Sequence, residues 1–235
     1  MISICRHTLR LILSALGFVL ISCAAHASME LSNVIFHFEP GEAARQDVEV
    51  FNSGEQPLYV EITPTVVRSP GDAGEKREVI KDPRESGLLV TPNRLIVPPG
   101  ASKMVRMVKM GNSPDERVYR VTAKPVIGGL EADQSGVKVM IGYELLAIVY
   151  PPNPRPDIVV QRNGQQLIVR NQGNTNVLFR EGYQCERDDL PREECAPLPG
   201  KRVYPGNEWI IDLPLDRPVT YYQSTGTRNF VETYP

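Results

Sequence analysis

The segment Gly136–Pro151 reads GVKVMIGYELLAIVYP, and its apolar pattern changes halfway along. Most alternate residues from Val137 to Leu145 are apolar, whereas the positions between them include Lys138 and Glu144. A period of two predicts a β-strand with one apolar face. From Leu145 to Tyr150 every residue is apolar, which is the pattern of a strand buried on both faces. The segment predicts a long strand that is one-sided at first and then enclosed, although a core strand with a frayed polar start would read the same way.

Shorter alternating runs precede this strand, separated by Gly, Pro, Asn and Asp, while helical periodicity is almost absent. Six runs predict strands: Val34/Phe36/Phe38, Val48/Val50, Leu58/Val60/Ile62, Leu95/Val97, Met104/Val108 and Tyr119/Val121/Ala123. Together with the long strand they suit an immunoglobulin-like β-sandwich. We expect this N-terminal domain to span residues 28–151.

The proline-rich segment Pro151–Pro156 interrupts the pattern, because proline removes a main-chain donor and cannot continue a sheet. A second small β-sandwich is expected over residues 157–235. Its predicted strands are Ile158–Val160, Leu167–Val169, Val177–Phe179, Trp209–Ile211, Val219–Tyr221 and Phe230–Val231, with turns at Asn163-Gly164, Gly173-Asn174 and Pro205-Gly206. The sequence therefore predicts an all-β protein of two sandwich domains joined by a stiff elbow.

The N-terminus has the form of an export signal over residues 1–27, with Arg6 and Arg10, an apolar run and the small-residue site Ala25-His26-Ala27. The apolar run is too short for a stable membrane anchor, so we expect cleavage after Ala27 and a periplasmic protein. Leu20–Cys23 also has the form of a lipoprotein box, which would instead leave an acylated Cys23. The formal net charge of −2 gives no indication of nucleic-acid binding.

Of the four cysteines, Cys5 and Cys23 fall in the signal, which leaves Cys185 and Cys195 in the exported chain. Two cysteines in an oxidising compartment predict one disulfide, here across the polar hairpin tip Glu186–Asp189. A redox or metal role is not indicated, because no CxxC motif and no histidine cluster accompanies the pair.

Catalytic chemistry is poorly represented in the exported chain. Its one histidine, His37, lies between Phe36 and Phe38, where we expect strand packing or surface exposure rather than a triad or metal site. The acid pairs Asp115-Glu116 and Glu193-Glu194 do not converge, since neighbours on a strand face opposite ways. No nucleotide, hydrolase or metalloprotease motif occurs, so we expect no enzymatic activity, no cofactor and no metal.

Aromatic residues leave one alternative open. Trp209, Tyr221 and Tyr222 could form a stacking platform for sugars. The chain would then be a secreted or lipid-anchored adhesion or carbohydrate-binding module.

Several segments, in this order and spacing, resemble the PapD-like periplasmic chaperones of pilus assembly over nearly the whole exported chain. They are LSNVIF at 31–36, VFNSGEQP at 50–57, VTPNRLIVPPG at 90–100, MVRM at 104–107, VYRV at 118–121, and the long strand 137–150 with the prolines after it. The resemblance implies a chaperone that binds pilus subunits, lends them a strand to complete their fold, and delivers them to an outer-membrane usher. The donor residues carried over from the family are Val137, Val139 and Ile141, with Tyr143 as a further candidate.

The chain departs from the family pattern where typical members hold the subunit's C-terminal carboxylate with an arginine and a lysine. Asn33 and Ala147 align with those positions, and neither can form a charge-assisted bond with a carboxylate. We therefore expect an atypical branch of the family, in which another basic residue binds the carboxylate. The alternative is that the basic residues available are ordinary solvated charges. The candidates, in order, are Arg120, Lys124, Arg106 and Arg94.

The elbow shows a second departure. Pro151 stands where typical members have an arginine in an ion-pair network between the domains. Arg155 is the expected substitute.

Overall fold

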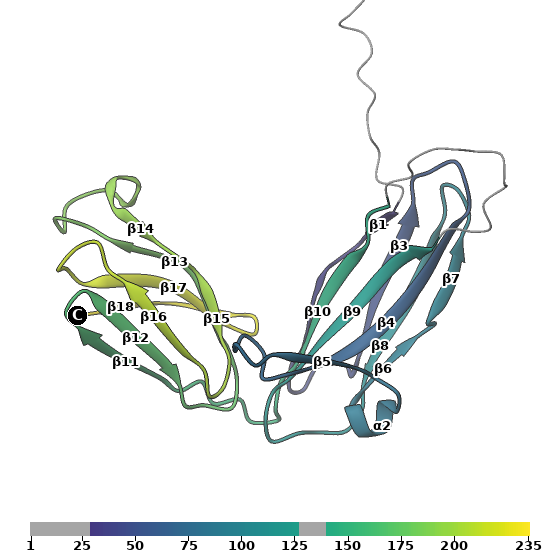
Figure 1. Cartoon of the computed structure of the whole chain (residues 1–235), viewed down its shortest axis with the longest axis horizontal. Helices are drawn as coiled ribbons and strands as arrows, with labels where there is room; N and C mark the ends of the chain where they lie inside the picture. The colour runs from purple at the N-terminus through teal and green to yellow at the C-terminus, as the bar shows by residue number, and fades with distance from the viewer. Residues whose placement is uncertain (1–28, 127–139) are drawn as a thin grey trace, which may run out of the picture.

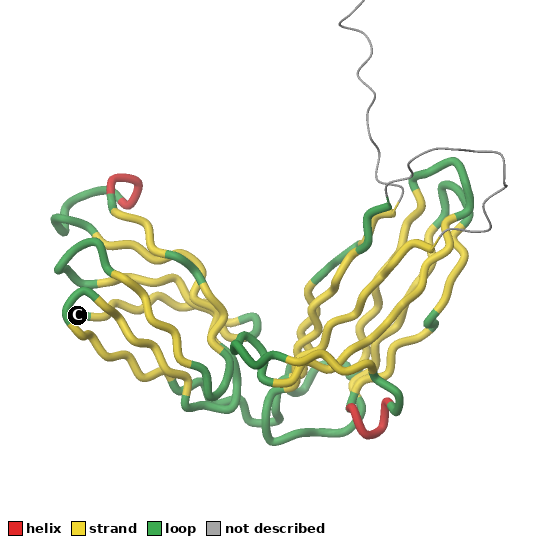
Figure 2. Tube along the Cα trace, viewed as in Figure 1, coloured by secondary structure: helices red, strands yellow, loops and turns green. Residues whose placement is uncertain are grey.

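A computed structural model describes residues 29–126 and 140–235 of the chain. These residues form two β-sandwiches that splay apart like the arms of a V (Figure 1). Strands make up most of both arms, and the helical segments of the described residues are single short turns (Figure 2). The predicted all-β fold of two sandwich domains is thus confirmed. The signal segment with Cys23, and Val137 and Val139 of the long strand, lie outside the described residues.

The N-terminal sandwich consists of a four-stranded and a six-stranded sheet. The first sheet has the order β1 (Met29–Leu31), β3 (Arg45–Asn52), β8 (Ser102–Lys109) and β6 (Leu88–Thr91). The second has the order β2 (Ile35–Phe38), β10 (Tyr143–Val149), β9 (Arg117–Val126), β4 (Leu58–Arg68) and β5 (Lys76–Val79), with β7 (Arg94–Val97) also paired to β4. Strand β10 runs antiparallel to β9 and parallel to β2.

Alternate apolar residues of the two sheets form the core between them, as the period-two runs predicted. In β8 the buried face is the opposite of the predicted one. Val105 and Met107 are buried, while Met104 is exposed and Val108 only partly buried. The sequence MVRMV has apolar residues on both faces, so its pattern does not decide the orientation. Tertiary pairing does, because Val105 lies opposite the core residue Val48.

Two short elements between β4 and β6 gave no sequence signal. All four residues of β5 are exposed, so this edge strand has no apolar face to detect. The helical turn α2 (Pro83–Ser86) begins at Asp82, whose side chain accepts a hydrogen bond from the Arg84 amide at 2.8 Å. It ends at Gly87, whose φ of 85° suits glycine.

The C-terminal sandwich consists of a three-stranded and a five-stranded sheet. The smaller sheet has the order β11 (Ile158–Asn163), β12 (Gln166–Asn171) and β16 (Glu208–Asp212). The larger has the order β14 (Ala196–Leu198), β13 (Val177–Gln184), β17 (Val219–Thr225) and β18 (Arg228–Tyr234), with β15 (Lys201–Val203) also paired to β13. Six of these strands contain the predicted runs, and β14 and β15 were not predicted.

Strand β10 is buried on both faces from Leu145 onward, as its sequence predicted, and the two faces serve different purposes. Leu145, Ala147 and Val149 join the core of the N-terminal sandwich. The alternating residues Leu146, Ile148 and Tyr150 form a second apolar cluster with Val67 and Val118 of the neighbouring strands and Tyr204 of the C-terminal domain. The continuous apolar run is therefore explained by a domain interface on one side of the sheet.

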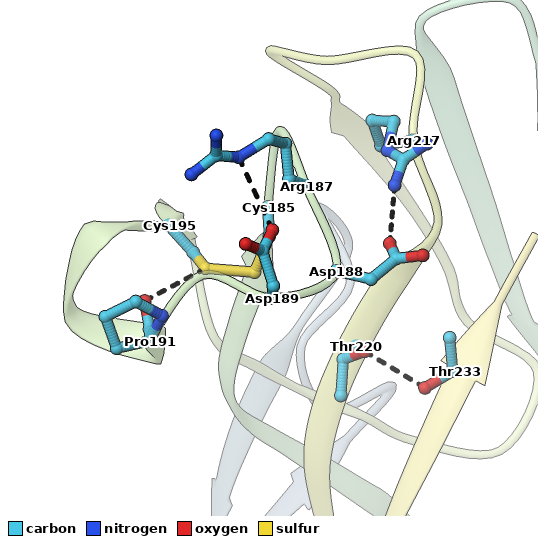
Figure 3. Close-up of a disulfide and its surroundings, with 9 residues drawn as sticks. All are labelled: Cys185, Arg187, Asp188, Asp189, Pro191, Cys195, Arg217, Thr220 and Thr233. Carbon is cyan, nitrogen blue, oxygen red and sulfur yellow. Dashed lines mark hydrogen bonds and ion pairs between the residues drawn. A yellow bond between two sulfur atoms is a disulfide. The ribbon is translucent and has the colours of Figure 1, made fainter.

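The predicted disulfide between Cys185 and Cys195 is present (Figure 3). It closes the loop between β13 and β14, which includes the single turn η1 (Arg192–Glu194). Within this loop Arg187 pairs with Asp189, and Asp188 accepts from Arg217 at 2.5 Å. The bridge thus ties the base of a polar loop at the end of the domain.

Candidate functional site

One face of the six-stranded sheet is directed toward the C-terminal domain. It carries the apolar cluster of Leu146, Ile148 and Tyr150 near the elbow, and we call it the interdomain face. Because side chains alternate along a strand, Glu144 of β10 lies on the same face as Leu146. Arg120, Thr122 and Lys124 of β9 likewise share the face of Val118. The interdomain face therefore changes from apolar to charged with distance from the elbow.

Arg120, the first candidate anchor, belongs to a charged cluster on this face. Its Nε lies 3.9 Å from Glu144 Oε2. The same carboxylate accepts a hydrogen bond of 2.6 Å from Arg77 Nη1, although β5 is separated from β10 by β4 and β9. Arg77 also pairs with Glu75 at 3.2 Å. The cluster brings two guanidinium groups to one point beside the domain interface.

Arg77 was not predicted from the sequence. It belongs to the all-exposed strand β5, whose position at the sheet edge becomes known only from the tertiary structure. The hairpin that leads into β5 also contacts the second domain, since Asn207 Nδ2 donates to the Pro70 carbonyl at 2.8 Å. The hairpin therefore lies at the angle of the V, while β5 itself is held by its pairing with β4.

Lys124 and Arg94 lie further from the elbow. Lys124 is exposed and opposite Glu61, which pairs with Arg94 at 3.5 Å. Among the described residues Lys124 has no ion-pair partner. Three exposed apolar residues lie side by side on β7, β4 and β9, namely Ile96, Tyr59 and Val126.

Arg106 lies on the other sheet, in β8. It donates to both carboxylate oxygens of Asp47, at 2.8 and 3.0 Å. The hydrogen bond from Arg106 lowers the pKa of Asp47. The structure therefore brings Arg106 together with a partner of its own sheet and not with Arg120.

The positions aligned with the family's two anchors do not reach this cluster. Asn33 lies between β1 and β2, where its side chain bonds the main chain of Val34 and Ile35. Ala147 is fully buried in the N-terminal core. A longer side chain at Ala147 would enter the core rather than the angle between the domains.

The described part of the candidate donor segment begins at Met140. Ile141 precedes β10 and is 53% exposed. Tyr143 instead packs against the N-terminal core, and its hydroxyl donates to the Met29 carbonyl at 3.0 Å. Tyr143 thus has a partner within its own domain, whereas Ile141 is accessible.

Strand β10 has an open edge at this same point. Strand β2 pairs only with Leu146–Val149, while β9 pairs with Tyr143–Val149. Within the described residues, Tyr143–Leu145 have no ladder partner on the β2 side. Main-chain groups there can accept another strand.

Glu116 makes several of the polar contacts between the domains. Its Oε2 accepts hydrogen bonds from Thr175 Oγ1 at 2.8 Å and from the Asn176 amide and Nδ2 at 2.9 and 2.6 Å. Burial of this carboxyl group raises its pKa.

Arg155 was the expected substitute for the family's interdomain arginine. Its main-chain amide donates to Asn174 Oδ1, and its side chain takes part in no ion pair with the described residues. The expectation of an Arg155 ion pair was wrong, because proline-bounded Arg155 is directed to solvent.

His37 also belongs to the interface region, half-buried, with Nδ1 3.0 Å from the Tyr150 hydroxyl. Burial lowers its pKa, and Arg202 adds to the effect.

The described residues contain no group of three or more His, Cys, Asp or Glu side chains that could hold a metal ion. None of their helices is long and apolar enough to span a membrane.

The aromatic platform considered for sugars does not form. Tyr221 is fully buried, and its ring packs against Trp209 and Phe179 in the C-terminal core. Tyr222 faces the opposite way, beneath the guanidinium of Arg192 at 4.7 Å. Adjacent residues of one strand face opposite ways, so Trp209, Tyr221 and Tyr222 do not make one surface.

No family model matches the chain. Two fimbrial proteins of Escherichia coli are similar in sequence. A CS1 fimbrial protein is 28% identical over 171 residues, which cover 69% of this chain and 71% of that protein. A CFA/I fimbrial protein is 27% identical over 167 residues, which cover 67% and 69%.

Solved structures match over both domains. The class 5 fimbriae chaperone CfaA has a TM-score of 0.65 at 21% identity, covering 87% of this chain and 98% of that chain. A chain from the Salmonella enterica complex of the pilin SafA with the chaperone SafB has a TM-score of 0.62 at 14% identity, covering 90% and 99%. The protein therefore has the two-domain fold of the PapD-like fimbrial chaperones, as the resemblance predicted.

Proposed function

We propose that the protein is a periplasmic chaperone without enzymatic activity, which binds fimbrial subunits and delivers them to an outer-membrane usher. The two-domain fold it shares with CfaA supports the proposal. The similarity to two fimbrial proteins of Escherichia coli supports the same process.

The open edge of β10 at Tyr143–Leu145, next to exposed Ile141, is the observation that carries the mechanism. A subunit that lacks one strand can pair its own edge with this main chain. Val137, Val139 and Ile141 would then fill the gap in the subunit core. Each large side chain buried in this way contributes about 1.5–3 kcal/mol.

The subunit's C-terminal carboxylate would bind on the interdomain face. Arg120 is our proposed anchor, because it lies on the strand next to β10 and beside the domain interface. Lys124 follows on the same face without an ion-pair partner among the described residues. Arg106 is not retained, since Asp47 already engages its guanidinium on the other sheet.

The test of strand donation is the substitution Val139→Asp. A charge that must enter an apolar subunit core prevents complementation, so the subunit should be degraded or aggregate. Co-expression with a cognate fimbrial subunit, followed by measurement of subunit yield in the periplasm, gives the result.

Val231→Asp is the matched control, since Val231 is exposed in β18 of the C-terminal domain. We expect this variant to give the same subunit yield that the wild type gives. An unchanged yield with Val139→Asp would refute strand donation.

A further inference from the structure

Glu144 is placed between the two arginines of the interdomain face. Its Oε1 accepts from Arg77 Nη1 at 2.6 Å, and its Oε2 lies 3.9 Å from Arg120 Nε. The side chains of Arg77, Glu144 and Arg120 are 44%, 39% and 29% exposed. All three are thus accessible to a ligand from the open side of the sheet.

The two carboxylates of this cluster are held differently. Glu75 accepts a main-chain hydrogen bond from Gly71 at 2.9 Å in addition to its pair with Arg77. That bond ties Glu75 to its own hairpin. Among the described residues, the Glu144 carboxylate has only the two arginines as partners. Glu144 is therefore the carboxylate that can leave without breaking a main-chain contact.

Exchange of Glu144 for another carboxylate requires little energy. Ion pairs between partly exposed side chains contribute little to stability, because water screens the charges. An incoming carboxylate would restore the same charge balance, and the arginines could bind it in a bidentate manner. Position favours the exchange too, because Glu144 belongs to the open-edged part of β10.

We propose that Glu144 is an internal counter-ion that holds Arg77 and Arg120 in the empty chaperone and yields them to the C-terminal carboxylate of a bound subunit. The inference rests on the proposed function. It assigns Arg77 to the binding site together with Arg120, and it makes Glu144 a competitor of the ligand. The site would then select a free main-chain carboxylate and bind it more weakly than two unpaired arginines would.

The experiment uses the full chaperone and a fluorescent synthetic peptide of the subunit's final strand, with either a free or an amidated C-terminus. Fluorescence anisotropy measures both affinities. Glu144→Gln keeps the size of the side chain and removes its charge, so it should bind the free-acid peptide about three- to tenfold more tightly. Glu144→Ala should act in the same direction, and neither variant should alter binding of the amidated peptide.

The arginine variants should have the opposite effect. Arg77→Ala and Arg120→Ala should each weaken binding of the free-acid peptide by about tenfold or more. Both should leave the amidated peptide unchanged. Glu78→Gln is the matched control, because Glu78 forms an exposed ion pair with Arg68 in the same hairpin. We expect it to bind both peptides like the wild type.

The outcomes separate the two proposals. A wild-type chaperone that fails to protect the full subunit refutes the proposed function. Protection and preference for the free acid, with unchanged affinity in both Glu144 variants, would overturn the role of Glu144 alone. An effect of Arg120→Ala without one of Arg77→Ala would remove Arg77 from the site and equally overturn the inference.

Discussion

Asn52 and Asn171 have the same role at equivalent points of the two domains. Each ends a strand, is buried, and donates two hydrogen bonds from Nδ2: Asn52 to the carbonyls of Gln56 and Val97, Asn171 to those of Thr175 and Val203. Each Oδ1 accepts from the amide of a glycine two residues later. The two domains thus repeat one local arrangement, and its sequence signal is a single Asn-x-Gly triplet in each.

Asn171→Asp should destabilise the C-terminal domain. A carboxylate cannot donate, so two buried carbonyls lose their partners and a charge is buried beside them, which should lower the free energy of unfolding by about 3 kcal/mol or more. Urea unfolding measures the change. Asn163→Asp, at the exposed end of β11, should remain within experimental error of the wild type, and equal stability of the two variants would contradict the structural role of Asn171.

Strand elements owe their boundaries to different contacts. Strand β10 is defined by its neighbours, with β9 along its whole length and β2 along its last part. The short strand β14 is held to β13 next to the disulfide, where Gln184 lies opposite Ala196. One element is thus stabilised by burial on both faces, and the other by a covalent link at its start.

The disulfide is expected to stabilise the C-terminal domain. Replacement of Cys185 and Cys195 by serine frees the loop in the unfolded chain and should lower the free energy of unfolding by about 2–3 kcal/mol. Urea unfolding of the double variant gives the value, with the wild type in reductant as the comparison. Subunit protection should persist, because the loop lies in the other domain from Arg120; loss of protection in a folded variant would argue against this separation.

The two sandwiches are held together by an apolar cluster and by polar contacts beside it. Tyr204 packs onto Leu146, Ile148 and Tyr150, while Glu116 accepts three hydrogen bonds from the C-terminal domain. A further contact joins Glu39 to the Thr227 amide at 2.6 Å. These contacts join the two domains at the angle of the V.

The prediction for the whole molecule concerns pH. Burial raises the folded-state pKa of Glu116 above the ordinary 4.5, so the folded protein binds its proton more readily than the unfolded chain. The stabilisation from this protonation is fully present below the unfolded pKa and is lost as pH rises through the folded pKa. Glu116→Gln removes this dependence, so wild-type stability should decline relative to the variant over that interval.

Urea unfolding at a series of pH values compares the wild type with Glu116→Gln. Exposed Glu193→Gln is the matched control, and its difference from the wild type should not follow the same curve. A constant difference between the wild type and Glu116→Gln across the interval would show that Glu116 titrates alike in both states.

Much of the fold follows from local pattern. Alternation of apolar residues predicted seven strands of the N-terminal domain and six of the C-terminal domain. The pair Cys185 and Cys195 predicted the disulfide, and the apolar run to Tyr150 predicted burial on both faces. The sequence did not predict edge strand β5, because that strand has no apolar face. It did not predict the orientation of β8, because that strand has apolar residues on both faces. Part of the candidate site was not predicted for the same reason, because Arg77 belongs to β5.

Local sequence patterns are enough to identify this chain as a pair of sandwiches, because hydrophobic alternation sets which side of each strand is removed from water. Which charged side chains meet depends on how the strands and domains are arranged in space. Arg77, Arg120 and Glu144 are far apart in the chain and come together through sheet order, and Glu116 meets Asn176 only because the domains pack at one angle. Charged side chains follow no period, so their partners are known only once the strands have been placed.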